Sequence, residues 1–339
     1  EALRLVCRKL VDKEVGVLDD LAEVEAIGHR VVHGGERFTD PVRVDDSVKN
    51  AIRLCASLAP LHNPPNLGGI TACEKAFPET PNVAVFDTAF HQSMKPASYL
   101  YAIPYELYEN YGIRKYGFHG TSHKFVFQAT ADFLGKPEDE VKLITCHLGN
   151  GCSITAIDGG RVVDTSMGMT PLPGLVMGTR CGDLDPGVVL YLLKQDMTPE
   201  QIDNLLNKKS GLLGVSGGNS SDMRDIIAAA EEGHERTRRA LQMFIYRLVS
   251  YIGSYYTVLH GPDAVVFTGG IGENSGYIRK RVVDELNTIG CVLDEEANKN
   301  ADAQDIISTA DSTLKAVVMK TNEELMIAME TTRVLGWQP

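Results

Sequence analysis

The sequence is short of positive charge. It has 33 Lys and Arg residues against 45 Asp and Glu residues, which gives a formal net charge of −12 at pH 7. Non-specific nucleic-acid binding needs clustered positive charge, so we expect no nucleic-acid partner. An anionic small molecule would have to be bound by locally placed arginines that act against the overall field.

Long apolar runs and paired cysteines are also missing. No apolar run approaches the ~18 residues of a membrane-spanning helix, and we see no signal-peptide pattern, so we expect no membrane partner. The 7 cysteines include no C-x-x-C pair, which favours reduced thiols in a cytoplasmic protein over a disulfide framework. Internal repeats and low-complexity tracts are absent. What is present is a chain of 339 residues with 43% hydrophobic content, enough for two domains.

Residues 141–157, VKLITCHLGNGCSITAI, are the most informative stretch. Asn-Gly between two β-rich runs predicts a hairpin with a type I′ turn, in which both central residues have positive φ. This turn is either an ordinary hairpin turn or an anion nest whose N–H groups bind a phosphate. A second glycine-rich turn, TGGIGEN at 268–274, follows a predicted strand, precedes a predicted helix and favours the phosphate-binding alternative.

Hydrophobic periodicity and turn residues predict an α/β chain. Residues 96–113 are proline- and tyrosine-rich, so we expect loop and turn there. Further strands are expected at about 24–32, 82–88, 264–267 and 316–319, and helices at about 1–10, 45–58, 67–77, 122–134, 187–195, 198–207, 234–260, 275–288 and from 320–324 onward.

Two charged residues lie at the ends of predicted strands. Arg30 stands in an apolar strand ending, where a buried charge is costly unless it is paired, so it is either a structural ion-pair partner or an anion ligand. Asp87 lies at the carboxyl end of the strand 82–88, where the ligands of open α/β sheets gather.

A histidine-rich segment precedes the helix expected at 122–134. Thr121 or Ser122 suits the N-cap, and His119 then lies at a helix N-terminus, where anions are favoured. His119 and His123 are four residues apart, but no third ligand appears at helical spacing, so we disfavour a histidine metal site.

The glycine- and proline-rich segments 164–174 and 177–187 surround Arg180 and indicate a specified loop shape. Asp222 fits either a helix N-cap or a partner for a nucleoside hydroxyl, and Glu323 falls in the first turn of the last helix.

Several longer motifs are spread along the chain: HRVVHGGE at 29–36, PLHNP at 60–64, VFDTAFH at 85–91, YGFHGTSH at 116–123, HLGNG at 147–151, MGTR at 177–180, SSDMR at 220–224, GGIGEN at 269–274 and TNEE at 321–324. Taken together, these motifs resemble the acetate kinase (acetokinase) family over nearly all 339 residues. The resemblance implies an α/β fold of two RNase H-like domains of the acetate and sugar kinase/Hsp70/actin type, with ATP in the interdomain cleft. It places the first domain at 1–89 plus 325–339 and the second at 90–324.

The family's activity implies reversible transfer of the γ-phosphoryl group of ATP to acetate, giving ADP and acetyl phosphate. The resemblance also implies a cytoplasmic homodimer that needs Mg²⁺ or Mn²⁺, with Glu323 as metal ligand. It implies Asp87, His119 and Arg180 as catalytic residues, Arg30, Val32, Leu61, Phe118 and Pro171 as substrate-binding residues, and His147, Leu148, Gly149, Asn150, Gly151, Asp222, Met223, Arg224, Gly270, Ile271, Gly272, Glu273 and Asn274 as ATP-binding residues.

Asp87 matches the family's acid/base aspartate, but a substrate carboxylate with a pKa near ~4 is already ionised at neutral pH and needs no base. We therefore expect Asp87 to orient an arginine or a metal-bound water. Two alternatives stay open: a propionate or butyrate kinase of the same family, since one methylene is worth only ~0.8 kcal/mol of burial, and a non-enzymatic, Hsp70-like ATP-dependent binding protein.

The sequence departs from the family at its start. The family opens with a strand–turn–strand that carries N-x-G-S-S-S and contacts phosphate and metal, whereas residues 1–10 match the helix that follows. We expect a protein that truly begins at Glu1 to be poorly soluble, because strands 24–32 and 82–88 would lack neighbours. We expect it to show little acetate-dependent ATP turnover, with nucleotide binding partly retained.

Overall fold

The computed structural model describes residues 2–59 and 62–337, so Leu61 lies outside the described residues. The chain divides into two compact units: unit 1 is Glu1–Gln92 with Glu323–Pro339, and unit 2 is Ser93–Asn322. The sequence-based boundary at 324/325 grouped Glu323 with the second domain, whereas here Glu323 opens a helix of unit 1.

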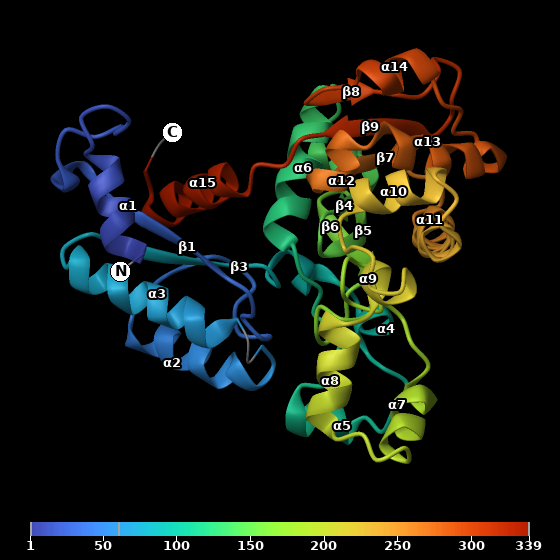
Figure 1. Cartoon of the computed structure of the whole chain (residues 1–339). Coiled ribbons are helices and arrows are strands. Elements are labelled where there is room, and N and C mark those ends of the chain that lie inside the picture. Colours follow the sequence, from blue (N-terminus) through green and yellow to red (C-terminus); the bar gives the residue numbers. More distant parts are fainter. Residues whose placement is uncertain (1, 60–61, 338–339) are drawn as a thin grey trace. The chain divides into compact units, whose positions relative to one another are not determined.

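Unit 1 contains a small mixed sheet in the order β1-β3-β2 (Figure 1). Strand β1 (Ile27–Val31) runs parallel to β3 (Asn82–Phe86), and β2 (Val42–Arg43) runs antiparallel to β3. Figure 1 shows α2 and α3 on one side of this sheet and α15 on the other. The helices of unit 1 are α1 (Ala2–Leu10), α2 (Asp46–Leu54), α3 (Asn63–Ala76) and α15 (Glu323–Leu335).

The alternation of side chains along β1 decides what each face meets. Val31 is fully buried in a core with Ile52 of α2 and Ile70 of α3. Gly28 turns to the other face, where an added Cβ would lie 2.5 Å from a side-chain carbon of Ile327 in α15. Arg30 shares the face of Gly28, and the strand therefore directs it toward the first turn of α15.

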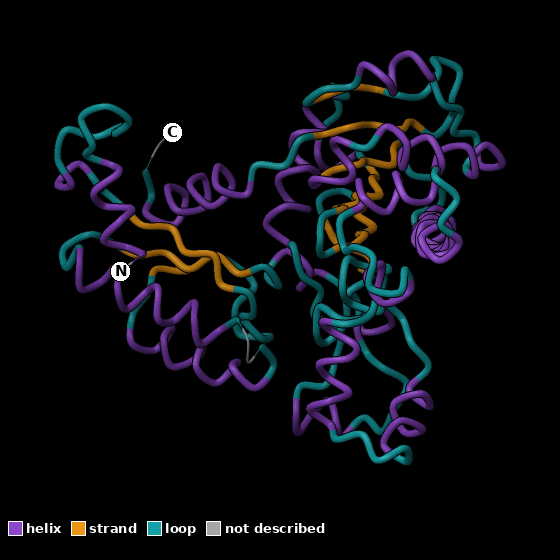
Figure 2. Tube along the Cα trace, in the orientation of Figure 1, coloured by secondary structure: helices purple, strands orange, loops and turns teal. Residues whose placement is uncertain are grey.

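Unit 2 is built on a six-stranded sheet in the order β6-β5-β4-β7-β9-β8. Figure 2 shows the strands in orange. The three middle strands β4, β7 and β9 are parallel, and the outer pairings are antiparallel. Their carboxyl ends therefore share one edge of the sheet. The strands are β4 (Lys142–Leu148), β5 (Cys152–Asp158), β6 (Arg161–Thr165), β7 (Ala264–Thr268), β8 (Gln304–Ile306) and β9 (Lys315–Met319).

Helices α6 and α11 lie on opposite sides of the unit 2 sheet in Figure 1. The helices of unit 2 are α4 (Pro96–Tyr99), α5 (Glu106–Tyr111), α6 (Gly120–Phe133), α7 (Pro186–Leu193), α8 (Pro199–Lys208), α9 (Gly211–Val215), α10 (Met223–Glu231), α11 (Glu235–Val258), α12 (Gly269–Asn274), α13 (Gly276–Glu285) and α14 (Glu295–Asn300). Short 3-10 helices span Leu21–Glu23, Cys55–Ser57, Phe90–Ser93, Glu138–Glu140 and Asn287–Ile289.

The α/β prediction is confirmed, with local corrections. The hairpin β4–β5 exists, but its turn is not type I′: three residues join the strands, and neither Asn150 nor its flanking glycines have positive φ. The glycine turn expected at 268–274 is the short helix α12. Helix α6 is capped by His119 in a left-handed conformation (φ 56°), not by Thr121 or Ser122. The loop expected at 96–113 contains α4 and α5.

Two expected absences can be compared with the structure. All 7 cysteines are free, so none forms a disulfide. Within residues 2–59 and 62–337, no helix has the length and apolar character needed to cross a membrane.

Candidate functional site

A pocket opens at the carboxyl ends of β4 and β7 in unit 2. Gly269, the first residue of α12 directly after β7, has a φ of +74°, and an added Cβ would lie 2.9 Å from the carbonyl oxygen of Leu148 at the end of β4. Glycine at this position therefore lets the start of α12 approach the β4–β5 turn closely. The resulting pocket has a volume of about 630 Å³ and is lined by Gly149, Asn150, Ser221, Asp222, Met223, Arg224, Ile227, Gly270, Ile271, Asn274 and Ser275.

Most residues predicted to bind ATP line this pocket, but His147, Leu148, Gly151, Gly272 and Glu273 are not among its lining residues. Sequence reasoning missed Ser221, Ile227 and Ser275. Ile227 follows Met223 by four residues in α10, so the two share a helix face, and that spacing was the signal that could have found it.

Asp222 is both the N-cap of α10 and the partner of Arg224. It accepts from the backbone N–H of Arg224 at 2.9 Å, and the Arg224 guanidinium donates to both carboxylate oxygens at 3.0 and 2.6 Å. These hydrogen bonds lower the pKa of Asp222 to about 2. The Asp222 carboxylate is therefore ionised and suited to accept a hydrogen bond from a ribose hydroxyl. The exposed guanidinium plane of Arg224 can stack on a base.

Glu273 has a structural role in this geometry. Its Oε1 accepts from the N–H of Gly269 at 2.9 Å and from the N–H of Thr321 at 3.1 Å. The carboxylate thus holds the start of α12 against the segment that leads into α15.

A histidine pair lies beside the β4–β5 turn. His119 stacks on His147 with ring centroids 4.3 Å apart, and its Nδ1 lies 2.9 Å from Oγ of Ser153. His147 is bonded through its own Nδ1 to Oγ of Ser122 at 2.8 Å. Hydrogen bonds through Nδ1 fix the orientation of both rings.

Arg180 lies beside the same β4–β5 turn. Its Nη1 donates to the carbonyl of Pro171 at 2.7 Å, and burial lowers its pKa, although a guanidinium stays charged. A Cβ added at Gly151 would lie 2.7 Å from Nη2 of Arg180 and 3.6 Å from Cε1 of His119. The two predicted catalytic groups of unit 2 therefore both lie beside the position that a Cβ of Gly151 would occupy.

Arg30 and Asp87 form an ion pair in unit 1. Nε and Nη2 of Arg30 donate to the two oxygens of Asp87 at 3.1 and 2.5 Å, and this carboxylate raises the pKa of Arg30. The Asp87 side chain is 1% exposed, while that of Arg30 is 44% exposed, so the guanidinium keeps an accessible side. Val32 is buried, and its N–H donates to Asn66 at 3.2 Å.

Glu323 is the candidate metal ligand. Its Oε2 lies 3.8 Å from Nε of Arg30, and burial, reinforced by Asp87 and opposed by Arg30, raises its pKa. No group of three or more His, Cys, Asp or Glu side chains that could hold a metal occurs in the described part of the chain. Glu323 nevertheless fits Mg²⁺, which keeps several waters and needs one or two carboxylates beside substrate phosphates.

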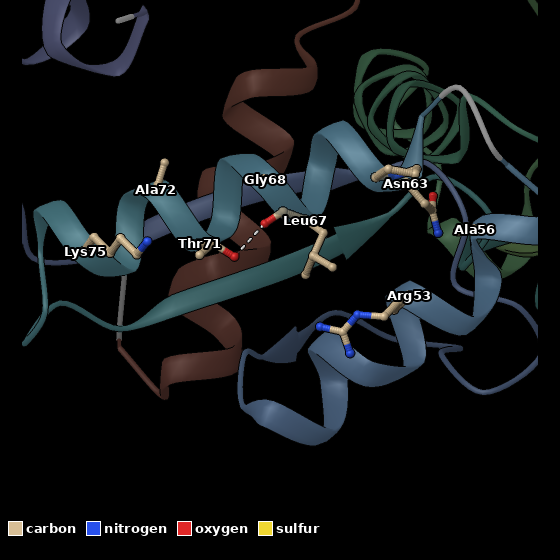
Figure 3. A pocket seen from close by; sticks show the side chains of 9 residues that line it. Arg53, Ala56, Asn63, Leu67, Gly68, Thr71, Ala72 and Lys75 are labelled. Carbon is tan, nitrogen blue, oxygen red and sulfur yellow. Dashed lines mark hydrogen bonds between the residues drawn. The ribbon is translucent and has the colours of Figure 1, made fainter.

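A second groove lies between α2 and α3 (Figure 3) and has a volume of about 580 Å³. Its walls are mainly apolar, with Arg53 on α2 and Lys75 on α3. None of the residues predicted for the site lines this groove.

Comparison with known proteins identifies the chain as a phosphotransferase of the kinase class. The family model described as "Acetokinase family" matches residues 1–329, and the chain belongs to this family. It is 55% identical to the acetate kinase of Methanosarcina thermophila over 336 residues, which are 99% of this chain and 82% of that protein.

Two solved structures agree with this assignment. The acetate kinase of Porphyromonas gingivalis superposes with a TM-score of 0.94 at 43% identity, over 98% of this chain and 84% of the other. A propionate kinase from Francisella tularensis superposes with a TM-score of 0.92 at 44% identity, with the same coverage. The fold is therefore that of the acetate kinases.

Proposed function

We propose that this protein is an acetate kinase, which transfers the γ-phosphoryl group of ATP to acetate reversibly. The observation that carries the proposal is the pocket of about 630 Å³, whose lining coincides with loops that the family resemblance assigns to ATP. Acetate is proposed as the phosphoryl acceptor because the chain belongs to the acetokinase family and its Methanosarcina relative is named acetate kinase.

The chemistry is an in-line displacement. A carboxylate oxygen of acetate forms a bond to the γ-phosphorus while the bond from that phosphorus to the bridging oxygen of ADP breaks. Such transfer depends mainly on positioning and charge neutralisation. Arg180 and His119 supply donors for the oxygens of the transferring phosphoryl, and Arg30 binds the acetate carboxylate.

Asp87 acts here by holding Arg30, not as a base. Its two oxygens are engaged by the guanidinium, and the acetate carboxylate has no proton to lose. Glu323 would hold Mg²⁺ or Mn²⁺, which neutralises phosphate charge when bound. The acetate methyl group is proposed to contact the apolar side chains of Val32, Leu61, Phe118 and Pro171.

The direct test is ATP turnover with and without acetate, with acetyl phosphate trapped by hydroxylamine. We expect turnover to require acetate. Arg180→Ala and Arg30→Lys should each lower kcat/KM by about 10²-fold or more, because neither replacement makes the bidentate contact. Turnover that is independent of acetate would instead indicate the Hsp70-like alternative.

Because the chain also resembles a propionate kinase, propionate is an alternative phosphoryl acceptor to acetate. Val32 lies two positions past Arg30, so Val32→Ala should lower KM for propionate relative to acetate if Val32 contacts the acyl group. Discrimination between the two acids should be only ~10–200-fold in the parent. If the ratio of KM for propionate to KM for acetate were the same in the variant and the parent, Val32 would not contact the acyl group.

We also propose a cytoplasmic homodimer whose subunits have two domains, with boundaries within a few residues of the predicted 89/90 and 324/325. Apolar side chains on and before α7 are 38–62% exposed and offer a surface to a second copy: Leu184, Val188, Leu190, Tyr191 and Leu193. Light scattering should report a dimer that Leu190→Glu weakens. Leu54→Glu, at an exposed leucine of α2, is the matched control and should leave the mass unchanged.

A further inference from the structure

The carboxylate of Asp183 joins two loop segments of unit 2 that lead to Arg180. Its Oδ1 accepts from the N–H of Gly174 at 2.8 Å, and the N–H of Asp183 donates to the carbonyl of Gly174 at 3.0 Å. Pro171 lies three residues before Gly174, and Arg180 lies three residues before Asp183. This pair of hydrogen bonds therefore holds the segment that carries Pro171 against the segment that carries Arg180.

The second oxygen of the same carboxylate attaches this junction to α11. Oδ2 of Asp183 accepts from Nη1 of Arg247 at 2.9 Å and from the phenol of Tyr251 at 2.8 Å. Burial, reinforced by Asp183, raises the pKa of Tyr251, so its phenol stays a neutral donor at physiological pH. Arg247 and Tyr251 are four residues apart on one face of a 24-residue helix, which gives the junction a rigid support.

The position of the two segments decides how the guanidinium of Arg180 is oriented. Its Nη1 donates to the carbonyl of Pro171 at 2.7 Å, so the donor lies on one segment and the acceptor on the other. A backbone bond from the N–H of Gly178 to the carbonyl of Asn150, at 3.1 Å, restrains the main chain near Arg180. Asp183 adds the connection between that part of the loop and the Pro171 segment.

We propose that Asp183 is a positioning residue for Arg180: its carboxylate holds the Pro171 and Arg180 segments together and attaches them to α11. The side chains of Asp183 and Arg247 are 40% and 34% exposed. Ion pairs with this exposure contribute little to stability, so we expect the carboxylate to act on the geometry of Arg180 more than on Tm. The benefit for phosphoryl transfer rests on the proposed function, whereas the junction itself does not.

Hydrogen–deuterium exchange tests the junction without any assay of activity. Asp183→Ala should speed exchange of the Gly174 amide by about tenfold or more, because this N–H loses its acceptor. The control is Asp185→Ala, which removes a carboxylate two residues away that accepts from the N–H of Gly187 at 2.8 Å. It should leave the Gly174 amide at the parental rate. Unchanged exchange in Asp183→Ala, or equally fast exchange in Asp185→Ala, overturns the proposal.

Kinetics measure the consequence for Arg180. Asp183→Ala should lower kcat by about tenfold or more, with KM for ATP within about threefold, because neither Asp183 nor its α11 partners are among the residues that line the nucleotide pocket. Tyr251→Phe removes a single hydrogen bond and should lower kcat by about two- to fivefold. Parental kcat in Asp183→Ala, or in Tyr251→Phe where Asp183→Ala does not fold, contradicts the proposal.

A double-mutant cycle distinguishes positioning of Arg180 from a general structural role. In the Arg180→Ala background no guanidinium is left to position, so adding Asp183→Ala should change kcat by less than about twofold. An equal loss of kcat in the parent and in the Arg180→Ala background would show that Asp183 does not act through Arg180. A parent without acetate-dependent turnover refutes the proposed function and leaves the exchange measurement decisive for the junction.

Discussion

At Gly151 the missing side chain sets where Arg180 lies. An alanine Cβ would come within 2.7 Å of Nη2 of Arg180 and 3.6 Å of Cε1 of His119. The guanidinium is the mobile end of a long side chain, so it would move away from the turn while the backbone stays in place. Gly151→Ala should therefore lower kcat by about tenfold or more and shift Tm very little.

The measurement is steady-state kinetics beside thermal unfolding. Gly253→Ala in α11 is a suitable control, because Gly253 lies outside the predicted site and its added Cβ meets no atom within 4 Å outside its own helix. A Gly151→Ala protein with parental kcat would show that Arg180 need not occupy its present position.

Glu323 should cost stability at neutral pH. Burial and Asp87 raise its pKa above the ordinary 4.5, so the folded protein binds this proton more tightly than the unfolded chain. The free energy of unfolding therefore decreases as pH rises from about 4.5 through the raised folded pKa, and it stays lower above that value. Glu323→Gln should raise Tm at pH 7 and abolish most turnover, and its advantage in Tm should vanish toward pH 4.

The matched control is Glu324→Gln, which removes an exposed carboxylate from the same first turn of α15. Thermal unfolding between pH 4 and 8 decides the point. Equal Tm changes in the two variants at pH 7 would show that the burial of Glu323 carries no cost.

At the scale of elements, the sequence pattern predicted those strands, helices and caps that are determined by residues close to one another in the sequence. The strands β4, β7 and β9, the long helix α11 and the N-cap Asp222 follow from periodicity and from a short side chain that accepts from the backbone. Failures occurred where tertiary contacts override propensity. His119 takes a left-handed conformation for which residue type alone gives little signal, and α12 folds as a helix although glycine disfavours helices.

The candidate site also combines features set by local sequence with features set by tertiary contacts. Motifs were enough to predict which loops belong to the site. The Arg30–Asp87 pair, however, joins strands far apart in sequence, and only the parallel register of β1 and β3 brings the two residues together. Glu273 was assigned to ATP from its motif, although its carboxylate bonds the backbone of Gly269 and Thr321.

Two adjacent glycines at the start of α12 should differ sharply. Gly269 has positive φ, and an added Cβ would lie 2.9–3.0 Å from backbone atoms of Leu148, whereas Gly270 has open space. Gly269→Ala should destabilise the protein by more than ~1 kcal/mol, because backbone atoms cannot move aside. Gly270→Ala should remain close to the parent in Tm. Thermal unfolding checks both, and similar values for the two variants would show that β4 and β7 can separate there without cost.

At the scale of the whole molecule, the pocket that we propose for the nucleotide belongs to unit 2, and the Arg30–Asp87 pair belongs to unit 1. Nucleotide binding should therefore be separable from catalysis. Arg30→Lys keeps a cation beside the buried Asp87 but loses the bidentate fork, so turnover should fall while Kd for ATP stays within about threefold of the parent.

The opposite variant is Ile227→Glu, which places a carboxylate among the residues that line the pocket and leaves unit 1 unchanged. Repulsion of the nucleotide phosphates should raise Kd for ATP by about tenfold or more, a free-energy change of about 1.4 kcal/mol. Isothermal titration calorimetry with ATP, beside acetate-dependent turnover, measures both quantities on the same preparations. If Arg30→Lys weakened ATP binding as much as Ile227→Glu, the nucleotide would depend on unit 1, and assignment of binding to the unit 2 pocket alone would be wrong.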